Sequence, residues 1–317
     1  MLITSLRSVT VGSQFSINKM STRTFKDWVI AVRPWSFPAS VIPVLTSLGY
    51  LYFLSKNQSS ETFDWVNGWL TFPMLMILHA GGNLVSDYFD HIKGVDLPGS
   101  LNGVRHIQSG KFQPKTILHY GWTLLFIGAL LGLVILWRSS WEAVWIGVAA
   151  LALPLLYPWM KSHALGDLDI LLCFAMLPSI GVGYVVTGHY HWEMLFYCLS
   201  YGLLTVSILH ANNTRDIEND RRAGLHTLCG LIGSRASQYL YLVLLALPYT
   251  IVILLVVLGI WPLWSLLVLI TLPLAWKNVR LMFSVNPVQE QDIPTLDKQS
   301  AQLQMTFGLI LALSFVI

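Results

Sequence analysis

Long apolar runs, separated by short polar stretches, occupy most of the chain. Each run approaches the ~20 residues that a helix needs to cross a bilayer. The pattern predicts nine membrane-spanning helices, at approximately 34–54, 65–86, 116–137, 141–158, 167–188, 193–213, 238–258, 261–282 and 300–317. The ninth run is the weakest, because its strictly apolar part begins only at Met305 and is short for a span at ~1.5 Å per residue. We therefore predict an all-α membrane protein.

The composition agrees with a polytopic membrane protein. Of the 317 residues, 55% are apolar and only 11% are charged, and the mean hydropathy is positive. The net charge of +3 gives no indication of nucleic-acid binding. The three cysteines, Cys173, Cys198 and Cys229, lack the spacing of a metal site or a redox motif, and we interpret them as packing residues.

A polar N-terminal tail, 1–27, precedes the apolar part, 28–317. The tail carries Arg7, Lys19 and Arg23 but no acid before Asp27, as a transit peptide does. A disordered tail, or a start site assigned too early with Met20 as the true initiator, explains the same pattern. The sequence leaves these alternatives open.

The distribution of positive charge predicts the orientation. In the nine-helix topology, 17 of the 19 Lys and Arg residues fall on the N-terminal side of the membrane, and only Lys56 and Arg138 fall on the other. Because cytoplasmic loops collect Lys and Arg, the N-terminus is predicted to be cytoplasmic. For a bacterial protein the membrane would be the inner, cell membrane.

Two segments with the same Asn–Asp spacing lie at the ends of predicted helices 2 and 6. The first runs from Asn83 to Asp90 and the second from Asn212 to Asp220, and in both an Asn precedes an Asp by four residues. If both are helical, Asn83, Asp87 and Asp90 share one face, as do Asn212, Asp216 and Asp220. Helices 2 and 6 are four spans apart, so both segments emerge on the predicted cytoplasmic side, as an internal duplication with parallel halves would require.

The residues in these segments favour magnesium and phosphate chemistry. Carboxylates beside a membrane span are costly unless they face a wet cavity or a cation, so their placement indicates a functional site. Asp with Asn supplies the oxygen ligands that suit Mg²⁺. Nearby cations, of the kind that clamp phosphate oxygens, are Arg105, Lys111, Arg215, Arg221 and Arg222. Acids, Mg²⁺ and Arg at a membrane-embedded cavity point to a diphosphate carrying a lipid tail. If the diphosphate is allylic, its departure leaves a carbocation, which the ring face of Tyr157 or Trp159 would stabilise.

Simpler interpretations exist for several of these residues. Either Asp segment alone could be a helix cap or a solvated loop face. Arg221 and Arg222 could equally be positively charged residues that anchor a helix end at the cytoplasmic side of the membrane. His79 and His210 lie near the motifs, but a histidine in a membrane helix is more often structural than a ligand. A transporter is the main rival class, although the acids cluster on one side. A CDP-alcohol phosphotransferase also uses Asp and Mg²⁺, but the opening motif of that family is absent.

The motifs resemble those of the UbiA superfamily of intramembrane prenyltransferases. NLVSDYFDHIKGVD, which starts at Asn83, resembles the first Asp-rich motif in its menaquinone-branch form. ILHANNTRDIENDRRAG, which ends at Gly224, is similar to the second motif of 1,4-dihydroxy-2-naphthoate polyprenyltransferases and their animal relatives. RPWSFP from Arg33 and LGD ending at Asp167 are also like that branch, so the resemblance extends from about residue 28 to the end.

The resemblance implies a transmembrane prenyltransferase domain at 28–317, with nine helices around a central cavity that opens to lipid. It implies that Mg²⁺ is held by Asp87, Asp90, Asp96, Asp216 and Asp220, with Asn83 and Asn212 at the diphosphate. Arg105 would contact the diphosphate, and Arg33 and Asp167 would lie at the acceptor's end. Two residues depart from the family pattern. Ser86 stands where many members have a second Asn, and Leu225 stands where many have a Lys. Arg215 or Lys111 would then have to supply the positive charge of that Lys.

The function implied is transfer of a polyprenyl group from an allylic polyprenyl diphosphate to 1,4-dihydroxy-2-naphthoate in menaquinone synthesis. The alternative within the family is another aromatic acceptor, such as 4-hydroxybenzoate. The expected partners are the two substrates and the lipid bilayer.

Overall fold

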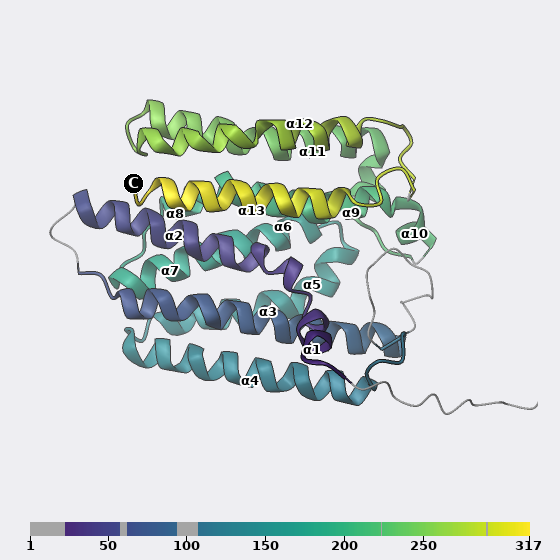
Figure 1. Ribbon diagram of the computed structural model, residues 1–317, viewed down its shortest axis with the longest axis horizontal. Helices are drawn as coiled ribbons and strands as arrows, with labels where there is room; N and C mark the ends of the chain where they lie inside the picture. The colour runs from purple at the N-terminus through teal and green to yellow at the C-terminus, as the bar shows by residue number, and fades with distance from the viewer. Residues whose placement is uncertain (1–22, 58–61, 94–106, 223, 290) are drawn as a thin grey trace, which may run out of the picture.

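The computed structural model describes residues 23–57, 62–93, 107–222, 224–289 and 291–317, and this part of the chain contains helices and no strand. Within these described residues, nine long helical segments run roughly parallel or antiparallel to one another (Figure 1). They are α2 (Pro38–Asn57), α3 (Trp65–Lys93), α4 (Pro114–Arg138), α5 (Ala143–Ser162), α6–α7 (Gly166–Leu171 and Leu177–Thr187), α8–α9 (Met194–Tyr197 and Leu199–Arg215), α11 (Leu228–Val257), η3–α12 (Leu263–Thr271 and Leu272–Met282) and α13 (Leu296–Ser314).

These nine segments overlap the nine predicted runs one by one, so the all-α fold class is confirmed. Among the helices that the structure describes, five are both long and apolar enough to cross a membrane: Pro38–Asn57, Pro114–Arg138, Gly166–Thr187, Leu228–Val257 and Leu263–Met282. That all nine cross stays a prediction. Two short elements, α1 (Phe25–Ala31) and α10 (Ile217–Arg222), lie at one end of the bundle, and the single turn η1 (Pro34–Ser36) leads into α2 (Figure 1).

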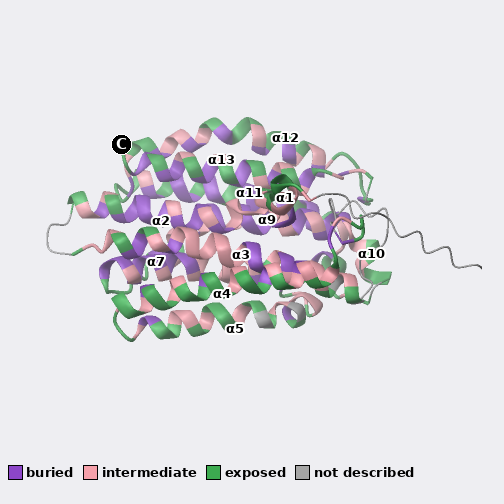
Figure 2. Ribbon diagram, turned by 60° about the horizontal axis from the view of Figure 1, so that its bottom comes forward, coloured by how far each residue is buried: buried purple, intermediate pink, exposed green. Residues whose placement is uncertain are grey.

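The outer helices expose large apolar side chains, whereas the inner ones are buried (Figure 2). On α4, Trp122, Phe126 and Trp137 are more than half exposed. In contrast α13, the run that the sequence marked as weakest, packs against α2 and α9 and buries Leu303, Phe307 and Leu311 completely. An apolar exterior around a packed interior is what a lipid-embedded bundle requires.

Small residues set the closest helix contacts. A Cβ on Gly121 of α4 would lie 2.9 Å from the side chain of Val85 on α3, and a Cβ on Gly49 of α2 would lie 2.7 Å from the backbone oxygen of Ala312 on α13. Such close approach between helices is typical of membrane packing. It holds α3, which carries the first Asp segment, firmly against α4.

Three of the breaks in the described helices interrupt α6–α7, α11 and the second Asp segment. A π-helical turn, Leu172–Met176, joins α6 to α7, and a left-handed Gly233 (φ 79°) interrupts the first part of α11. The second Asp segment is also broken, because α9 ends at Arg215 and α10 starts at Ile217. Non-helical geometry at membrane depth is tolerated where neighbouring elements bury it, and breaks of this kind often lie close to functional sites.

Candidate active site

The two Asp segments lie at the same end of the bundle, as the topology predicted (Figure 1). Asn83 and Asp87 occupy the C-terminal part of α3, and Asp216 follows directly after α9. The same end carries α1, α10 and the start of α13 (Figure 1). We call it the motif end.

The first Asp segment docks on the turn that precedes α2. The guanidinium of Arg33 forms an ion pair with Asp87. One helical turn earlier, Nδ2 of Asn83 donates to the Val32 carbonyl at 3.1 Å and to Oγ of Ser36 at 3.0 Å. Asn83 and Asp87 therefore share one face of α3, as predicted, and that face contacts the Val32–Ser36 turn.

His79 extends this contact by one more turn of α3. Its Nδ1 lies 2.5 Å from Oγ of Ser40 and its Nε2 lies 3.3 Å from Oγ of Ser36. The prediction of a structural role for His79 agrees with these bonds. Its spacing of four residues before Asn83 is the signal that could have placed it on the motif face from sequence.

The conformation of Arg33 explains how its side chain reaches Asp87. The residue adopts left-handed backbone angles (φ 55°, ψ 60°), which are uncommon outside glycine, and the next residue is Pro34 at the start of η1. Oγ of Ser36 donates to the Arg33 carbonyl at 2.8 Å and closes the turn. The reversal turns the chain from α1 into α2.

Helix α1 holds the start of this turn. Lys111 pairs with Oδ2 of Asp27 at 3.1 Å, and Trp28 packs edge-on against Phe112 and Tyr120. Hydrogen bonds from the backbone amide and hydroxyl of Thr24 lower the pKa of Asp27 to about 2, and Lys111 contributes further. Lys111, predicted at the diphosphate, is thus placed against α1 in this structure.

The second Asp segment surrounds a buried arginine. Arg215 is only 4% exposed, and its Nε and Nη2 donate to the two carboxylate oxygens of Asp216 at 2.8 and 2.9 Å. Nη2 also donates to Oδ1 of Asn212 at 2.5 Å, and Nη1 lies 3.5 Å from Asp297 of α13. Arg215 therefore links the motif residues of α9 to the last helix.

The second Asp segment is helical on both sides of a break at Asp216, so the condition for a shared face is met only in part. Asp216 has non-helical backbone angles, yet its amide bonds the Asn212 carbonyl at 3.0 Å and the Asp220 amide bonds the Asp216 carbonyl at 2.8 Å. The four-residue spacing therefore still brings the motif residues to one side. Burial raises the pKa of Asp220, the charge of Lys161 opposes this rise, and the nearby Asp216 carboxylate adds to it.

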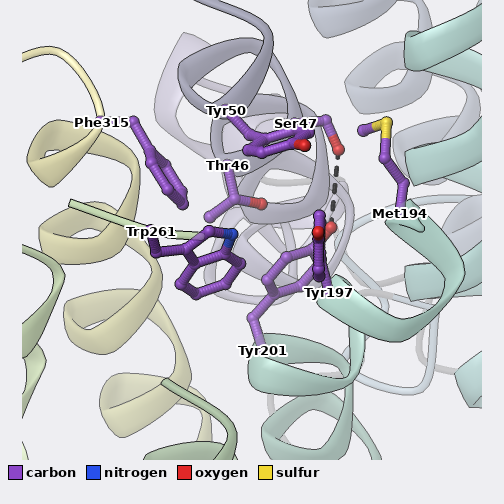
Figure 3. A pocket seen from close by; sticks show the side chains of 8 residues that line it. All are labelled: Thr46, Ser47, Tyr50, Met194, Tyr197, Tyr201, Trp261 and Phe315. Atoms are coloured by element: carbon purple, nitrogen blue, oxygen red, sulfur yellow. Dashed lines mark hydrogen bonds between the residues drawn. The ribbon is translucent and has the colours of Figure 1, made fainter. Parts of the chain in front are cut away.

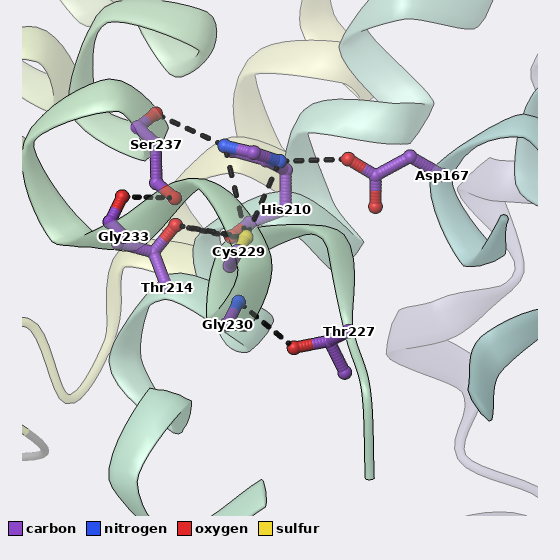
Figure 4. Close-up of polar contacts among 8 residues, drawn as sticks. All are labelled: Asp167, His210, Thr214, Thr227, Cys229, Gly230, Gly233 and Ser237. Atoms are coloured by element: carbon purple, nitrogen blue, oxygen red, sulfur yellow. Dashed lines mark hydrogen bonds and ion pairs between the residues drawn. The ribbon is translucent and has the colours of Figure 1, made fainter. Parts of the chain in front are cut away.

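Asp167 is tied to α9 by a histidine (Figure 4). Its Oδ2 lies 2.7 Å from Nδ1 of His210, and Nε2 of His210 donates to the Ser237 carbonyl at 3.0 Å. The sequence placed Asp167 at the acceptor's end and His210 in a structural role, but it gave no sign that the two side chains meet.

The remaining predicted residues lie on α3, α5 and α10, or outside the described part of the chain. Tyr157 lies half-buried on α5, and Trp159 is mostly exposed and stacks on His163 with ring centroids 4.4 Å apart. Asp90 lies on α3, but its side chain is not described, and Asp96 and Arg105 lie outside the described residues. Arg221 and Arg222 are exposed on α10.

An interior pocket lined by aromatic side chains lies away from these residues (Figure 3). Its volume of about 10 Å³ is at the limit for one water molecule. Its lining residues are Thr46, Ser47, Tyr50, Met194, Tyr197, Tyr201, Trp261 and Phe315. A pocket of this volume has no room for a ligand larger than water.

A comparison with known protein families identifies the family of the chain. Residues 33–292, which include both Asp segments, match the UbiA prenyltransferase family. The chain belongs to this family. It is therefore an integral membrane prenyltransferase.

Relatives of this UbiA chain include animal proteins. It is 34% identical over 293 residues to the UbiA prenyltransferase domain-containing protein 1 homolog of Drosophila melanogaster, a match that covers 90% of this chain and 78% of that one. It is 30% identical over 304 residues to UbiA prenyltransferase domain-containing protein 1 of Homo sapiens, covering 92% and 83% of the two chains.

Two solved structures share the fold. A UbiA homolog from Aeropyrum pernix K1 matches with a TM-score of 0.65 and 16% identity, covering 89% of this chain and 96% of that one. A UbiA homolog from Archaeoglobus fulgidus, bound to DMAPP and Mg²⁺, matches with a TM-score of 0.56 and 13% identity, covering 90% and 98%.

The carboxylates at the motif end fit a magnesium ion. In the described part of the chain no three His, Cys, Asp or Glu side chains form a ready-made metal cluster. However, Asp216 and Asp220 interact electrostatically, and Oδ2 of Asp220 is buried with no hydrogen-bond partner among the described residues. A buried, unsatisfied carboxylate oxygen beside a second carboxylate suits an oxygen-coordinated dication, since the ion would offset both costs.

Proposed function

We propose that the protein transfers a polyprenyl group from an allylic polyprenyl diphosphate to 1,4-dihydroxy-2-naphthoate, with Mg²⁺, in menaquinone biosynthesis. The observation that carries the proposal is that each Asp segment pairs its leading carboxylate with an arginine at the motif end. Arg33 pairs with Asp87 and Arg215 pairs with Asp216. Alternating acids and guanidinium groups suit a ligand that is itself a dication bound to a polyanion.

The diphosphate would be held between the two segments. Asp87, Asp90, Asp216 and Asp220, with Asp96 in support, are the proposed Mg²⁺ ligands. When bound, Mg²⁺ would neutralise the charge that develops on the departing pyrophosphate. Asn83 and Asn212 would orient the diphosphate, and Arg215 is the best-placed cation, because its four contacts fix the guanidinium in the site. Arg105 and Lys111 are the proposed outer contacts.

The aromatic acceptor would bind beside Arg33 and Asp167. A 1,4-dihydroxy-2-naphthoate ring presents a carboxylate that requires a cation and hydroxyl groups that require acceptors. Arg33 and Asp167 supply one of each. Tyr157 on α5 would stabilise the carbocation that forms at the prenyl C1 through its ring face.

One assay tests substrate class and acceptor together. Purified protein would receive Mg²⁺, a polyprenyl diphosphate, and 1,4-dihydroxy-2-naphthoate in competition with 4-hydroxybenzoate, and the products would be identified by mass. The proposal predicts the prenylated naphthalene as the main product. If the main product is prenylated 4-hydroxybenzoate, the acceptor is 4-hydroxybenzoate and not the naphthoate. If the prenyl diphosphate stays intact with every aromatic acid, the proposal is overturned.

We also propose that the motif end faces the cytoplasm. Cysteines introduced singly at Arg222 on α10 and at His189 in the exposed loop after α7 report the two ends. The wild type provides the background, since Cys198 and Cys229 are buried and Cys173 is half-buried. A membrane-impermeant thiol reagent should label R222C only from the cytoplasmic side and H189C only from the opposite side. The reverse pattern would invert the topology.

A further inference from the structure

The carboxylate of Asp167 is held by one oxygen and unsatisfied at the other. Its Oδ2 lies 2.7 Å from Nδ1 of His210, whereas Oδ1 is buried and has no hydrogen-bond partner among the described residues. Asp167 as a whole is only 9% exposed. A buried polar atom without a partner is destabilising, so such an oxygen is expected to receive a donor from something that the protein binds.

The hydrogen bonds of His210 determine which carboxylate oxygen of Asp167 stays without a partner. The Ser237 carbonyl at 3.0 Å can only accept, so Nε2 of His210 carries a proton. One further proton joins Nδ1 to Oδ2, whichever of the two atoms holds it. In either case Oδ1 remains a hydrogen-bond acceptor.

The surroundings of His210 restrict its ring to one position. The side chain is completely buried, and Sγ of Cys229 lies 3.5 Å from Nδ1 and 3.4 Å from Oγ1 of Thr214 (Figure 4). Thr214 in turn donates to the His210 carbonyl at 2.7 Å. The imidazole therefore acts as a rigid strut between α9, α11 and the first turn of α6.

This strut places Asp167 close to the second Asp segment. His210 lies on α9, and Asp216 directly follows the end of that helix, six residues or about 9 Å further along its axis. A Cβ on Gly166, the residue before Asp167, would lie 3.6 Å from the Cα of Lys161, so the start of α6 lies close to Lys161. The positive charge of Lys161 in turn opposes the rise that burial causes in the pKa of Asp220. The unsatisfied oxygen thus lies at the motif end, on the side of α5 and α9.

We infer that His210 is a positioning residue that holds Oδ2 of Asp167, so that Oδ1 accepts a hydrogen bond from a ring hydroxyl of the aromatic acceptor. A hydroxyl that donates to a carboxylate pushes electron density into its ring, and it also sets the ring's orientation towards the prenyl C1. This inference rests on the proposed function, because it requires a hydroxylated aromatic acceptor.

Two substitutions separate the two bonds of the imidazole. In His210→Asn, the amide nitrogen takes the place of Nδ1 and keeps the donor to Asp167, but the bond to Ser237 is lost. In His210→Gln, the amide nitrogen takes the place of Nε2 and keeps the bond to Ser237, but Asp167 loses its partner. Both variants remove the same ring, so a purely structural role of the ring would affect them alike.

The expected result is a split between the variants and between the substrates. His210→Gln should lower kcat/KM for the aromatic acceptor by about tenfold or more, as for loss of a charged hydrogen bond, with the KM for prenyl diphosphate unchanged. His210→Asn should stay within about threefold of the wild type. Equal losses in the two variants, or a raised KM for prenyl diphosphate, would overturn the inference while wild-type turnover upholds the function. A wild type that prenylates no aromatic acceptor overturns both.

Discussion

Arg33 and Asp87 form an ion pair across 54 residues of sequence, and this pair joins the turn before α2 to the first Asp segment. Both side chains are mostly buried. Because Arg33 adopts left-handed backbone angles, its side chain points back towards α3 rather than along the chain into α2. The cation proposed for the acceptor and a proposed metal ligand therefore belong to one site.

Removing Arg33 should weaken acceptor binding selectively. Loss of a charge-assisted hydrogen bond costs ~1.5–3 kcal/mol, or about tenfold to a hundredfold in affinity. Arg33→Ala should raise the KM for the naphthoate by that factor and leave the KM for prenyl diphosphate nearly unchanged, as steady-state kinetics would measure. Arg33→Lys keeps the charge and serves as the control. A rise confined to the diphosphate KM would instead assign Arg33 to the phosphate clamp.

Neutralising either motif carboxylate should abolish turnover without unfolding the protein. Asp87→Asn and Asp216→Asn each remove a charge that is proposed to hold Mg²⁺ on the leaving group, and EDTA should silence the wild type until Mg²⁺ is restored. Asp64→Asn is the matched control, because Asp64 also pairs with an arginine, Arg138, but at the opposite end of the bundle. Near-normal activity in either motif variant would disprove the metal assignment.

The long apolar helices were predictable because a bilayer requires a helix of about 20 apolar residues, and runs of that length are visible in the sequence. The common end of the two Asp segments followed from counting spans between them. The bonds that organise the site were not predictable. The Arg33–Asp87 pair depends on a left-handed turn, and the Asp167–His210 bond joins residues 43 positions apart. Periodicity within one helix carries no information about such contacts.

The break between α9 and α10 shows the same limit. The spacing of Asn212, Asp216 and Asp220 places the three residues on one face only if the segment is helical, but Asp216 leaves helical geometry where Arg215 bonds its carboxylate. The position of the Arg215 guanidinium also depends on a partner, Asp297 of α13, that lies far along the sequence.

Ionised Asp27 should keep α1 docked across the neutral pH range. The hydrogen bonds from Thr24 lower the pKa of Asp27 in the folded protein to about 2, below the ordinary value of ~4. Its contribution is therefore complete above about pH 4 and is lost only as the pH falls towards 2. Hydrogen-exchange protection of the α1 amides should be constant from pH 5 to 8 in the wild type and reduced in Asp27→Asn. Unchanged protection in that variant would show that α1 docks without the carboxylate.

The contact of α2 with α13 should not tolerate a methyl group at Gly49. A Cβ there would lie 2.7 Å from the backbone oxygen of Ala312, which cannot move aside cheaply. Gly49→Ala should destabilise the protein by about 1–3 kcal/mol, seen as a lower Tm in detergent. Gly82→Ala is the control, because nothing lies within 4 Å of its Cβ position. Equal Tm values for the two variants would contradict the close packing of α13.

Both Asp segments are proposed to act on one Mg²⁺-bound diphosphate. A double-mutant cycle on the binding of an unreactive prenyl thiodiphosphate tests it most directly, with the wild type, Asp87→Asn, Asp216→Asn and the double variant each titrated with and without Mg²⁺. The account predicts Mg²⁺-dependent binding that each single substitution weakens about tenfold or more. It also predicts that the double substitution weakens binding less than the product of the two single factors. Single factors that simply multiply, or binding that is indifferent to Mg²⁺, would contradict it.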